Sequence, residues 1–205
     1  MLFRFVDGYN IINVIDATVI CILLFIFSML KASSTSKAVM FFVHGGGFTK
    51  GSAREYEGEH LTRKGDVVLV TINYRLSIFG FFDSDGDDKW ENLGLWDIKL
   101  ALQWVQDNIE AFGGDKNRVT IFGGSAGGMI TSLMATSQEF KGLFHRVISQ
   151  SGTHLCPKLL ERNPKEVHNQ ILQRVNCDNS ECLKKVLYYH SVFFPIVNMD
   201  FNFSR

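Results

Sequence analysis

The sequence predicts an α/β fold, in which a mostly parallel sheet carries helices on both faces. Short apolar runs rich in β-branched residues alternate with longer stretches that have the spacing of helices, and this alternation is typical of parallel sheets. Glycine-rich segments directly follow two of the apolar runs. Because ligands bind at the carboxyl ends of parallel strands, these two segments indicate where a functional site lies.

Four apolar runs are predicted to form strands. They are Val39–Val43, Val67–Asn73, Val119–Phe122 and Val147–Ser149. The second run is apolar and β-branched over most of its length, which indicates a strand buried on both faces of the sheet. The carboxyl ends of the first and third strands are expected at one edge of the sheet.

Three helical stretches lie between these strands. Glu55–Lys64 is short and polar, and Gly128–Ala135 has apolar residues at helical spacing. Leu93–Phe112 is long and amphipathic, and two glycines after it end the helix. Its apolar stripe includes Trp96 and Trp104, which are therefore expected in the core and not at a substrate site.

The pentapeptide Gly123–Gly127 has the pattern Gly-x-Ser-x-Gly and follows the strand Val119–Phe122 directly. A strand, this pattern and a helix together form a nucleophile elbow, in which a sharp turn exposes one serine hydroxyl. The flanking glycines remove side chains that would clash in the strained turn. The sequence therefore predicts that Ser125 is a nucleophile that forms a covalent acyl intermediate, although the pentapeptide alone also fits a plain glycine-rich turn.

A second motif, His44–Phe48, follows the strand Val39–Val43 and reads His-Gly-Gly-Gly-Phe. A loop of this kind supplies backbone N–H groups to an oxyanion hole. Attack on an ester carbonyl places negative charge on its oxygen, and loss of one donor costs about 2.7–4 kcal/mol. The donors are assigned to Gly46 and Gly47 in this loop and to Ala126 directly after the serine.

Six blocks of the chain resemble the type-B carboxylesterases, the family that includes the cholinesterases. The blocks run in the family's order over about residues 38–185, and one of them is the family's serine signature. Gly124 departs from this signature, because many members have glutamate there. The blocks are Val43–Phe48, Thr71–Leu76, Asn92–Asp97, Ala101–Ile109, Phe112–Gly127 and Phe144–Gly152.

The resemblance implies a carboxylic-ester hydrolase with an incomplete α/β-hydrolase fold, a small-molecule ester as substrate and no cofactor. In this family the catalytic acid and histidine follow the serine, and they are expected beyond the residues of this chain. The histidines after Ser125 are not expected to be the base; they are His145, His154, His168 and His190. Two alternatives stay open, namely a catalytically inactive fragment and a non-catalytic relative that acts in adhesion or binding.

Both ends of the chain fall outside the resemblance, as in a partial gene model or a read-through. The expected division is an N-terminal segment at 1–36, a partial hydrolase domain at 37–187 and an unassigned tail at 188–205. No sheet strand is expected before residue 37.

Ile11–Leu30 is almost entirely apolar, so it is interpreted as a membrane anchor or a signal peptide, and a buried core helix fits less well because the run has no polar face. These interpretations place the protein in the secretory pathway, anchored or secreted.

The cysteines and the net charge indicate whether to expect a disulfide, a metal site or a nucleic-acid partner. The resemblance implies a small disulfide loop between Cys177 and Cys182, which an oxidising compartment favours, and two free thiols are the alternative. One Cys-x4-Cys pair does not make a zinc site, and the acidic loop Asp83–Asp88 fails the calcium-loop pattern, so no metal is expected. The formal net charge is +0, which gives no electrostatic reason to expect nucleic-acid binding.

Overall fold

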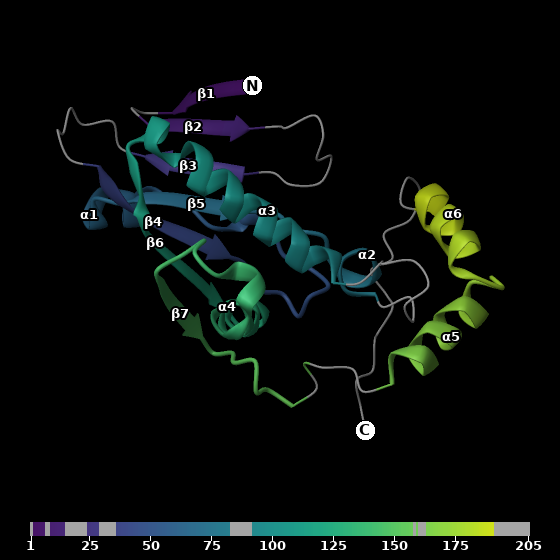
Figure 1. The fold of residues 1–205 in the computed structure, drawn as a ribbon. Coiled ribbons are helices and arrows are strands. Elements are labelled where there is room, and N and C mark those ends of the chain that lie inside the picture. The colour runs from purple at the N-terminus through teal and green to yellow at the C-terminus, as the bar shows by residue number, and fades with distance from the viewer. Residues whose placement is uncertain are drawn as a thin grey trace. The chain divides into compact units, whose positions relative to one another are not determined.

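The structure is a computed structural model. It describes residues 2–6, 9–14, 24–28, 36–82, 92–157, 159 and 163–190. These residues belong to two compact units of the chain. The first unit combines residues 1–81 with 92–156 and contains the sheet, and the second combines residues 82–91 with 157–205 and contains the two C-terminal helices (Figure 1).

The sheet of the first unit mixes antiparallel and parallel strands. Among the described residues its order is β1-β2-β3-β5-β4-β6-β7. The pairs from β1 to β5 are antiparallel, whereas the pairs from β5 to β7 are parallel. The strands are β1 (Leu2–Val6), β2 (Tyr9–Val14), β3 (Leu24–Ser28), β4 (Lys37–Val43), β5 (Val68–Ile72), β6 (Gly114–Gly124) and β7 (Arg146–Gln150).

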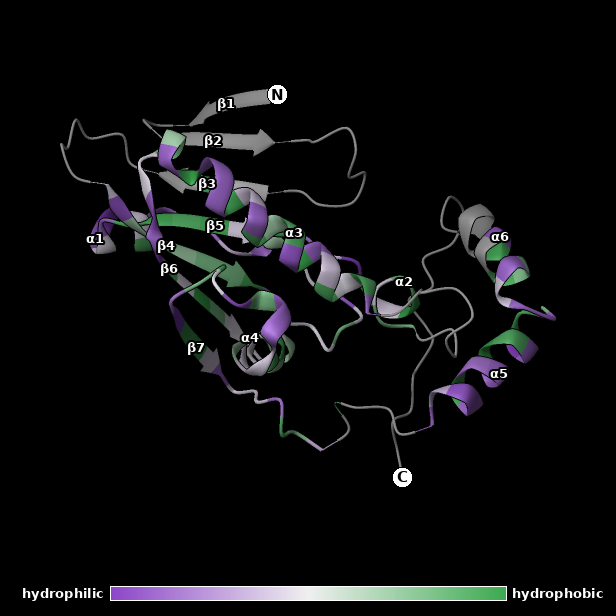
Figure 2. Cartoon of the chain, viewed as in Figure 1, coloured by the Kyte–Doolittle hydropathy of each residue, from purple (hydrophilic) through white to green (hydrophobic). Residues whose placement is uncertain are grey.

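The four runs predicted as strands form the parallel half of the sheet, β5-β4-β6-β7. β5 is buried at every position and is mostly apolar (Figure 2), as expected for a strand covered on both faces. β6 is longer than predicted, because it begins at Gly114 and not at Val119. The early start pairs Gly114 with Lys37 at the beginning of β4.

The N-terminal apolar segment contributes strands to the sheet. β2 and β3 include the described parts of Ile11–Leu30, and β3 pairs with β5 through Ile26 and Val70. Ile26 is 1% exposed. The expectation of no strand before residue 37 is therefore wrong, because a short apolar run fits a buried strand as well as a helix and periodicity alone does not separate them. Among the described residues no helix has the length and apolar character needed to cross a bilayer.

Helices cover both faces of the sheet. α1 (Glu59–Gly65) connects β4 to β5, and α3 (Leu93–Asn108) connects β5 to β6 in the opposite direction along the sheet. Because crossovers between parallel strands are right-handed, the two helices lie on opposite faces. α4 (Ala126–Thr136) follows β6, and the short α2 (Ser77–Phe81) follows β5. α1 starts later than predicted, because Ala53–Glu55 forms a separate 3₁₀ turn.

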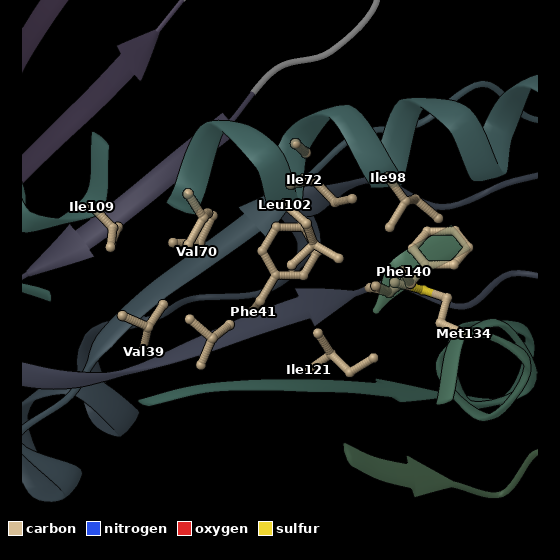
Figure 3. Packing of buried hydrophobic residues seen from close by; sticks show 14 of the residues in the cluster. Val39, Phe41, Val70, Ile72, Ile98, Leu102, Ile109, Ile121, Met134 and Phe140 are labelled. Atoms are coloured by element: carbon tan, nitrogen blue, oxygen red, sulfur yellow. The ribbon is translucent and has the colours of Figure 1, made fainter. Parts of the chain in front are cut away.

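The main hydrophobic core lies between the sheet and the helices α3 and α4 (Figure 3). Alternate residues of the central strands point into it, as the period of two in a strand requires. Side chains from both helices close the core on its other side. Its labelled members in the figure are Val39, Phe41, Val70, Ile72, Ile98, Leu102, Ile109, Ile121, Met134 and Phe140.

α3 buries a different face from the one predicted. Trp96 is 49% exposed and Leu100 is 42% exposed, and the Lys99 ammonium lies 4.7 Å from the centre of the Trp96 ring. The prediction that Trp96 lies in the core is therefore wrong, whereas Trp104 is half-buried and packs against the core. Apolar residues occur on two sides of this helix, so contact with the sheet decides which side is buried. The buried residues are Gly94, Asp97, Ile98, Ala101, Leu102 and Val105.

The second unit contains α5 (Pro164–Arg174) and α6 (Ser180–His190). A disulfide joins Cys177, which lies between the two helices, to Cys182, which lies in α6. This is the pairing that the resemblance implies. Ile171, Leu172 and Leu183 are buried in this unit. Residues 188–190 of the unassigned tail end α6, and the rest of the tail lies outside the described residues. The acidic loop Asp83–Asp88 lies outside them as well.

Candidate active site

Ser125 stands at the turn between β6 and α4. Its backbone has φ 55° and ψ −120°, and its side chain is exposed. A residue other than glycine in such a region costs about 1–3 kcal/mol and persists only where its surroundings enforce the conformation. Two hydrogen bonds enforce it here: the Ser125 N–H donates to the Gln150 carbonyl at 2.8 Å, and the Met129 N–H donates to the Ser125 carbonyl at 2.9 Å. This is the geometry of the predicted elbow.

The glycines beside Ser125 are required because backbone passes close on both sides. A Cβ atom at Gly123 would lie 2.6 Å from the Val43 carbonyl oxygen, and one at Gly127 would overlap the same oxygen. Gly124 is different, because a Cβ atom there would meet no atom within 4 Å. Gly124 therefore has room for a Cβ atom, so the turn does not require glycine at this position.

The glycine loop, residues 44–48, faces the elbow because β4 and β6 are parallel neighbours, with Val43 paired to Gly123. A Cβ atom at Gly45 would lie 2.6 Å from the Gly124 carbonyl oxygen and 3.4 Å from the Ser125 Cβ atom. The loop turns through Gly46, whose φ is 115° and whose carbonyl accepts hydrogen bonds from the N–H groups of residues 49 and 50. The structure therefore brings the loop and the serine together.

The three residues assigned as oxyanion donors lie on this pair of segments. Gly46 and Gly47 both have positive φ, which glycine adopts without strain. Ala126 is the first residue of α4. The first N–H groups of a helix have no partner inside it and carry partial positive charge, so the Ala126 N–H is free of the helix ladder.

His44, the first residue of the glycine loop, contacts Tyr74, and neither was singled out from the sequence. The Tyr74 hydroxyl donates to the His44 carbonyl at 2.7 Å, and the two rings stack at 4.5 Å between centroids. Burial lowers the pKa of His44 and raises that of Tyr74, because both charged forms lose solvation. A usable signal was present, since both polar residues closely follow buried apolar strands.

A partly buried ion pair joins the segment after β5 to α3. Arg75 donates through Nε to Asp97 Oδ2 at 2.8 Å and through Nη2 to Asp97 Oδ1 at 2.6 Å, and its backbone N–H donates to Oδ2 at 2.9 Å. Asp97 is 4% exposed. Nearby, the Ser77 N–H donates to the Phe48 carbonyl at 2.7 Å, so the end of the glycine loop is attached to α2.

The histidines that follow Ser125 have other partners. His145 Nδ1 accepts a hydrogen bond from the Val119 N–H at 3.3 Å, and His154 Nδ1 lies 2.8 Å from the Ser132 hydroxyl. His168 belongs to the second unit, where its Nε2 lies 3.4 Å from the Ser180 hydroxyl. The side chain of His190 lies outside the described residues. Within the described part of the chain, no histidine bonds to Ser125 and no cluster of potential metal ligands occurs.

Comparison with known proteins identifies the lineage. Residues 20–191 match the model of the carboxylesterase family. The chain belongs to the carboxylesterase family. The family match includes β3, which extends the resemblance further toward the N-terminus than the blocks in the sequence indicated.

Relatives within the carboxylesterase family include enzymes of several names. Carboxylesterase 3 of Homo sapiens is 42% identical over 161 residues, which cover 78% of this chain and 28% of that protein. Acetylcholinesterase-1 of Trittame loki is 46% identical over 147 residues, which cover 70% of this chain and 26% of that protein. The solved structure of a thermophilic pNB esterase matches with a TM-score of 0.72 and 37% identity, over 78% of this chain and 33% of that one. This chain therefore spans less than a third of these relatives' length by sequence, and it has the α/β-hydrolase fold in incomplete form.

Proposed function

We propose that this chain carries the nucleophile and the oxyanion hole of a carboxylic-ester hydrolase that acts on a small-molecule ester. Ser125 attacks the ester carbonyl, and the N–H groups of Gly46, Gly47 and Ala126 bind the oxyanion. The observation that carries this proposal is the strained and exposed backbone of Ser125 at φ 55°, set against the glycine loop. Backbone strain of this kind is frequent at active sites, and here it lies beside the glycine loop.

The reaction has two stages. The Ser125 hydroxyl adds to the carbonyl carbon and loses its proton to a base, which gives a tetrahedral oxyanion. When the oxyanion collapses, the alcohol leaves with a proton and the acyl group stays on the serine oxygen. Water then releases the acid by the same steps. The donors stabilise the charge that develops on the carbonyl oxygen in both stages.

The base and the acid that orients it are proposed to lie in carboxylesterase sequence beyond these 205 residues. The described histidines after Ser125 support this assignment, because the side chains of His145, His154 and His168 contact other residues. The non-catalytic alternative has less support, because the elbow and the glycine loop are both intact.

A fluorophosphonate probe tests the nucleophile directly, because it phosphonylates an activated serine. Because the proposed base lies outside these 205 residues, we expect slow labelling of the purified chain at Ser125, assisted by the oxyanion donors alone, and loss of labelling in Ser125→Ala. Ser151→Ala is the matched control, since Ser151 is also exposed and also has a left-handed backbone, with φ 54°. Labelling should persist in that variant. A folded chain that the probe does not label would indicate a non-catalytic relative.

We further propose that the protein follows the secretory route. The disulfide between Cys177 and Cys182 supports this proposal, because disulfides persist in oxidising compartments and are rare in the cytosol. Mass spectrometry of the protein from its native source, alkylated with and without reductant, tests it. Two free thiols in the unreduced sample would contradict it.

A further inference from the structure

The His44 side chain is enclosed at the start of the glycine loop. It is 1% exposed, and its Nδ1 atom lies 2.8 Å from the carbonyl oxygen of the next residue, Gly45. Its ring stacks on Tyr74 with an angle of 23° between the planes. On another side, a Cβ atom at Gly51 would lie 2.6 Å from His44 Nδ1, so glycine is needed for the chain to pass there.

These contacts determine which ring nitrogen of His44 carries the proton. A carbonyl oxygen accepts hydrogen bonds and cannot donate them, so Nδ1 must be the donor to Gly45. Nε2 is buried and has no hydrogen-bond partner in the described part of the chain. A second proton on Nε2 would therefore be a buried charge without an acceptor. The nearby Glu55 carboxylate favours that charge, but burial has the larger effect and lowers the pKa of His44.

The bond from His44 to Gly45 also sets the direction of a proposed oxyanion donor. The Gly45 carbonyl and the Gly46 N–H belong to one planar peptide group and point in opposite directions. A donor that holds the Gly45 oxygen therefore holds the Gly46 N–H as well. Gly51 packs against the same carbonyl oxygen, which restricts rotation of this peptide further.

We propose that His44 is a positioning residue of the oxyanion hole, whose neutral Nδ1–H form holds the Gly45 carbonyl and thereby aims the Gly46 N–H at the developing oxyanion. This role rests on the proposed function of Ser125. It concerns orientation only, since His44 does not reach the reacting atoms. The Tyr74 hydroxyl acts in the same way one peptide earlier, because it holds the His44 carbonyl at 2.7 Å.

Two substitutions separate positioning from simple packing. In His44→Asn the amide nitrogen takes the place of Nδ1 and can still donate to the Gly45 oxygen, whereas in His44→Gln the amide is one bond further out. Removal of an oxyanion donor lowers rates by about 10²–10³, so we expect His44→Gln to slow fluorophosphonate labelling of Ser125 about tenfold to a hundredfold. His44→Asn should keep most of the wild-type rate. His60→Asn and His60→Gln, on the exposed surface of α1, are the controls and should label as the wild type does.

Nitrogen-15 NMR of the wild-type imidazole tests the same bond without any activity. We expect His44 to carry its proton on Nδ1 and to stay neutral at pH values where exposed histidines titrate. A proton on Nε2, or titration with an ordinary histidine pKa, overturns the proposal, and so does equal labelling of folded His44→Asn and His44→Gln. Absence of labelling in the wild type instead contradicts the proposed function, and the NMR result then still decides whether the His44 bond exists.

Discussion

The elbow at Ser125 and the glycine loop at residues 44–48 face each other, but different contacts hold them in shape. Close contacts between backbone atoms hold the elbow, since β4 leaves no room for a side chain at Gly123 or Gly127. Side chains below the glycine loop hold that loop, through His44 and Tyr74. The elbow is therefore encoded by the absence of side chains within the motif, whereas the loop also depends on Tyr74, which follows strand β5.

The largest effect is expected at the elbow, in Gly127→Ala. The added Cβ atom would overlap the Val43 carbonyl, so β4 and α4 must separate, and overpacking of this kind costs about 3 kcal/mol. This loss exceeds the gain of about 1 kcal/mol from alanine as the better helix former. Urea unfolding monitored by circular dichroism measures the difference. Gly124→Ala is the control, because its Cβ atom meets no neighbour, and equal losses in both variants would remove the steric explanation.

A smaller effect is expected below the glycine loop, in Tyr74→Phe. The ring stack on His44 remains, but the His44 carbonyl loses its donor and becomes a buried acceptor without a partner, which costs about 1–2 kcal/mol. Labelling of Ser125 should also slow, because the peptide before Gly45 is less restrained. The matched control is Tyr56→Phe, since Tyr56 is 39% exposed. A stability unchanged in Tyr74→Phe would mean that the loop does not depend on this hydroxyl.

The smallest effect is expected from the charge state of His44. Burial lowers the His44 pKa in the folded chain, so as the pH falls the unfolded chain binds the proton first. The resulting contribution to stability is complete above the unfolded pKa of about 6.5 and is lost as the pH falls through the lower folded pKa. Urea unfolding between pH 8 and pH 5 should show a steeper loss for the wild type than for His44→Asn. Parallel curves would show that His44 titrates equally in both states.

The titration of Asp115 does not affect the comparison of stability between the wild type and His44→Asn. A side-chain hydrogen bond from Arg118 is the main cause that lowers the pKa of Asp115, and its ordinary value is already 3.8. Its protonation therefore affects stability only at more acidic pH than the His44 window. Both His44→Asn and the wild type retain Asp115, so its contribution cancels in the difference between their curves.

Local sequence was sufficient for the elbow, because its requirements lie within a few consecutive residues. A strand, two obligatory glycines and a helix determine a turn in which Ser125 is exposed, and no distant residue is needed to recognise it. The parallel strands β4, β5 and β6 were predictable for a similar reason, since short continuous runs of β-branched apolar residues are typical of strands buried on both faces of a sheet. The glycine loop was located from its motif, but the support from Tyr74 was not, because thirty residues separate it from His44.

Other features depended on contacts that sequence order does not reveal. The described parts of the N-terminal apolar run lie in β2 and β3, and β3 pairs with the edge of β5. In α3, Ile98 is buried and Trp96 is exposed because only one side of the helix meets the sheet. By itself, the sequence determined the family and the turn at which Ser125 is exposed, since both depend on short motifs of consecutive residues. The tertiary structure decided which apolar surfaces are buried and which side chains contact the glycine loop, because burial and hydrogen bonding depend on which distant segments pack together.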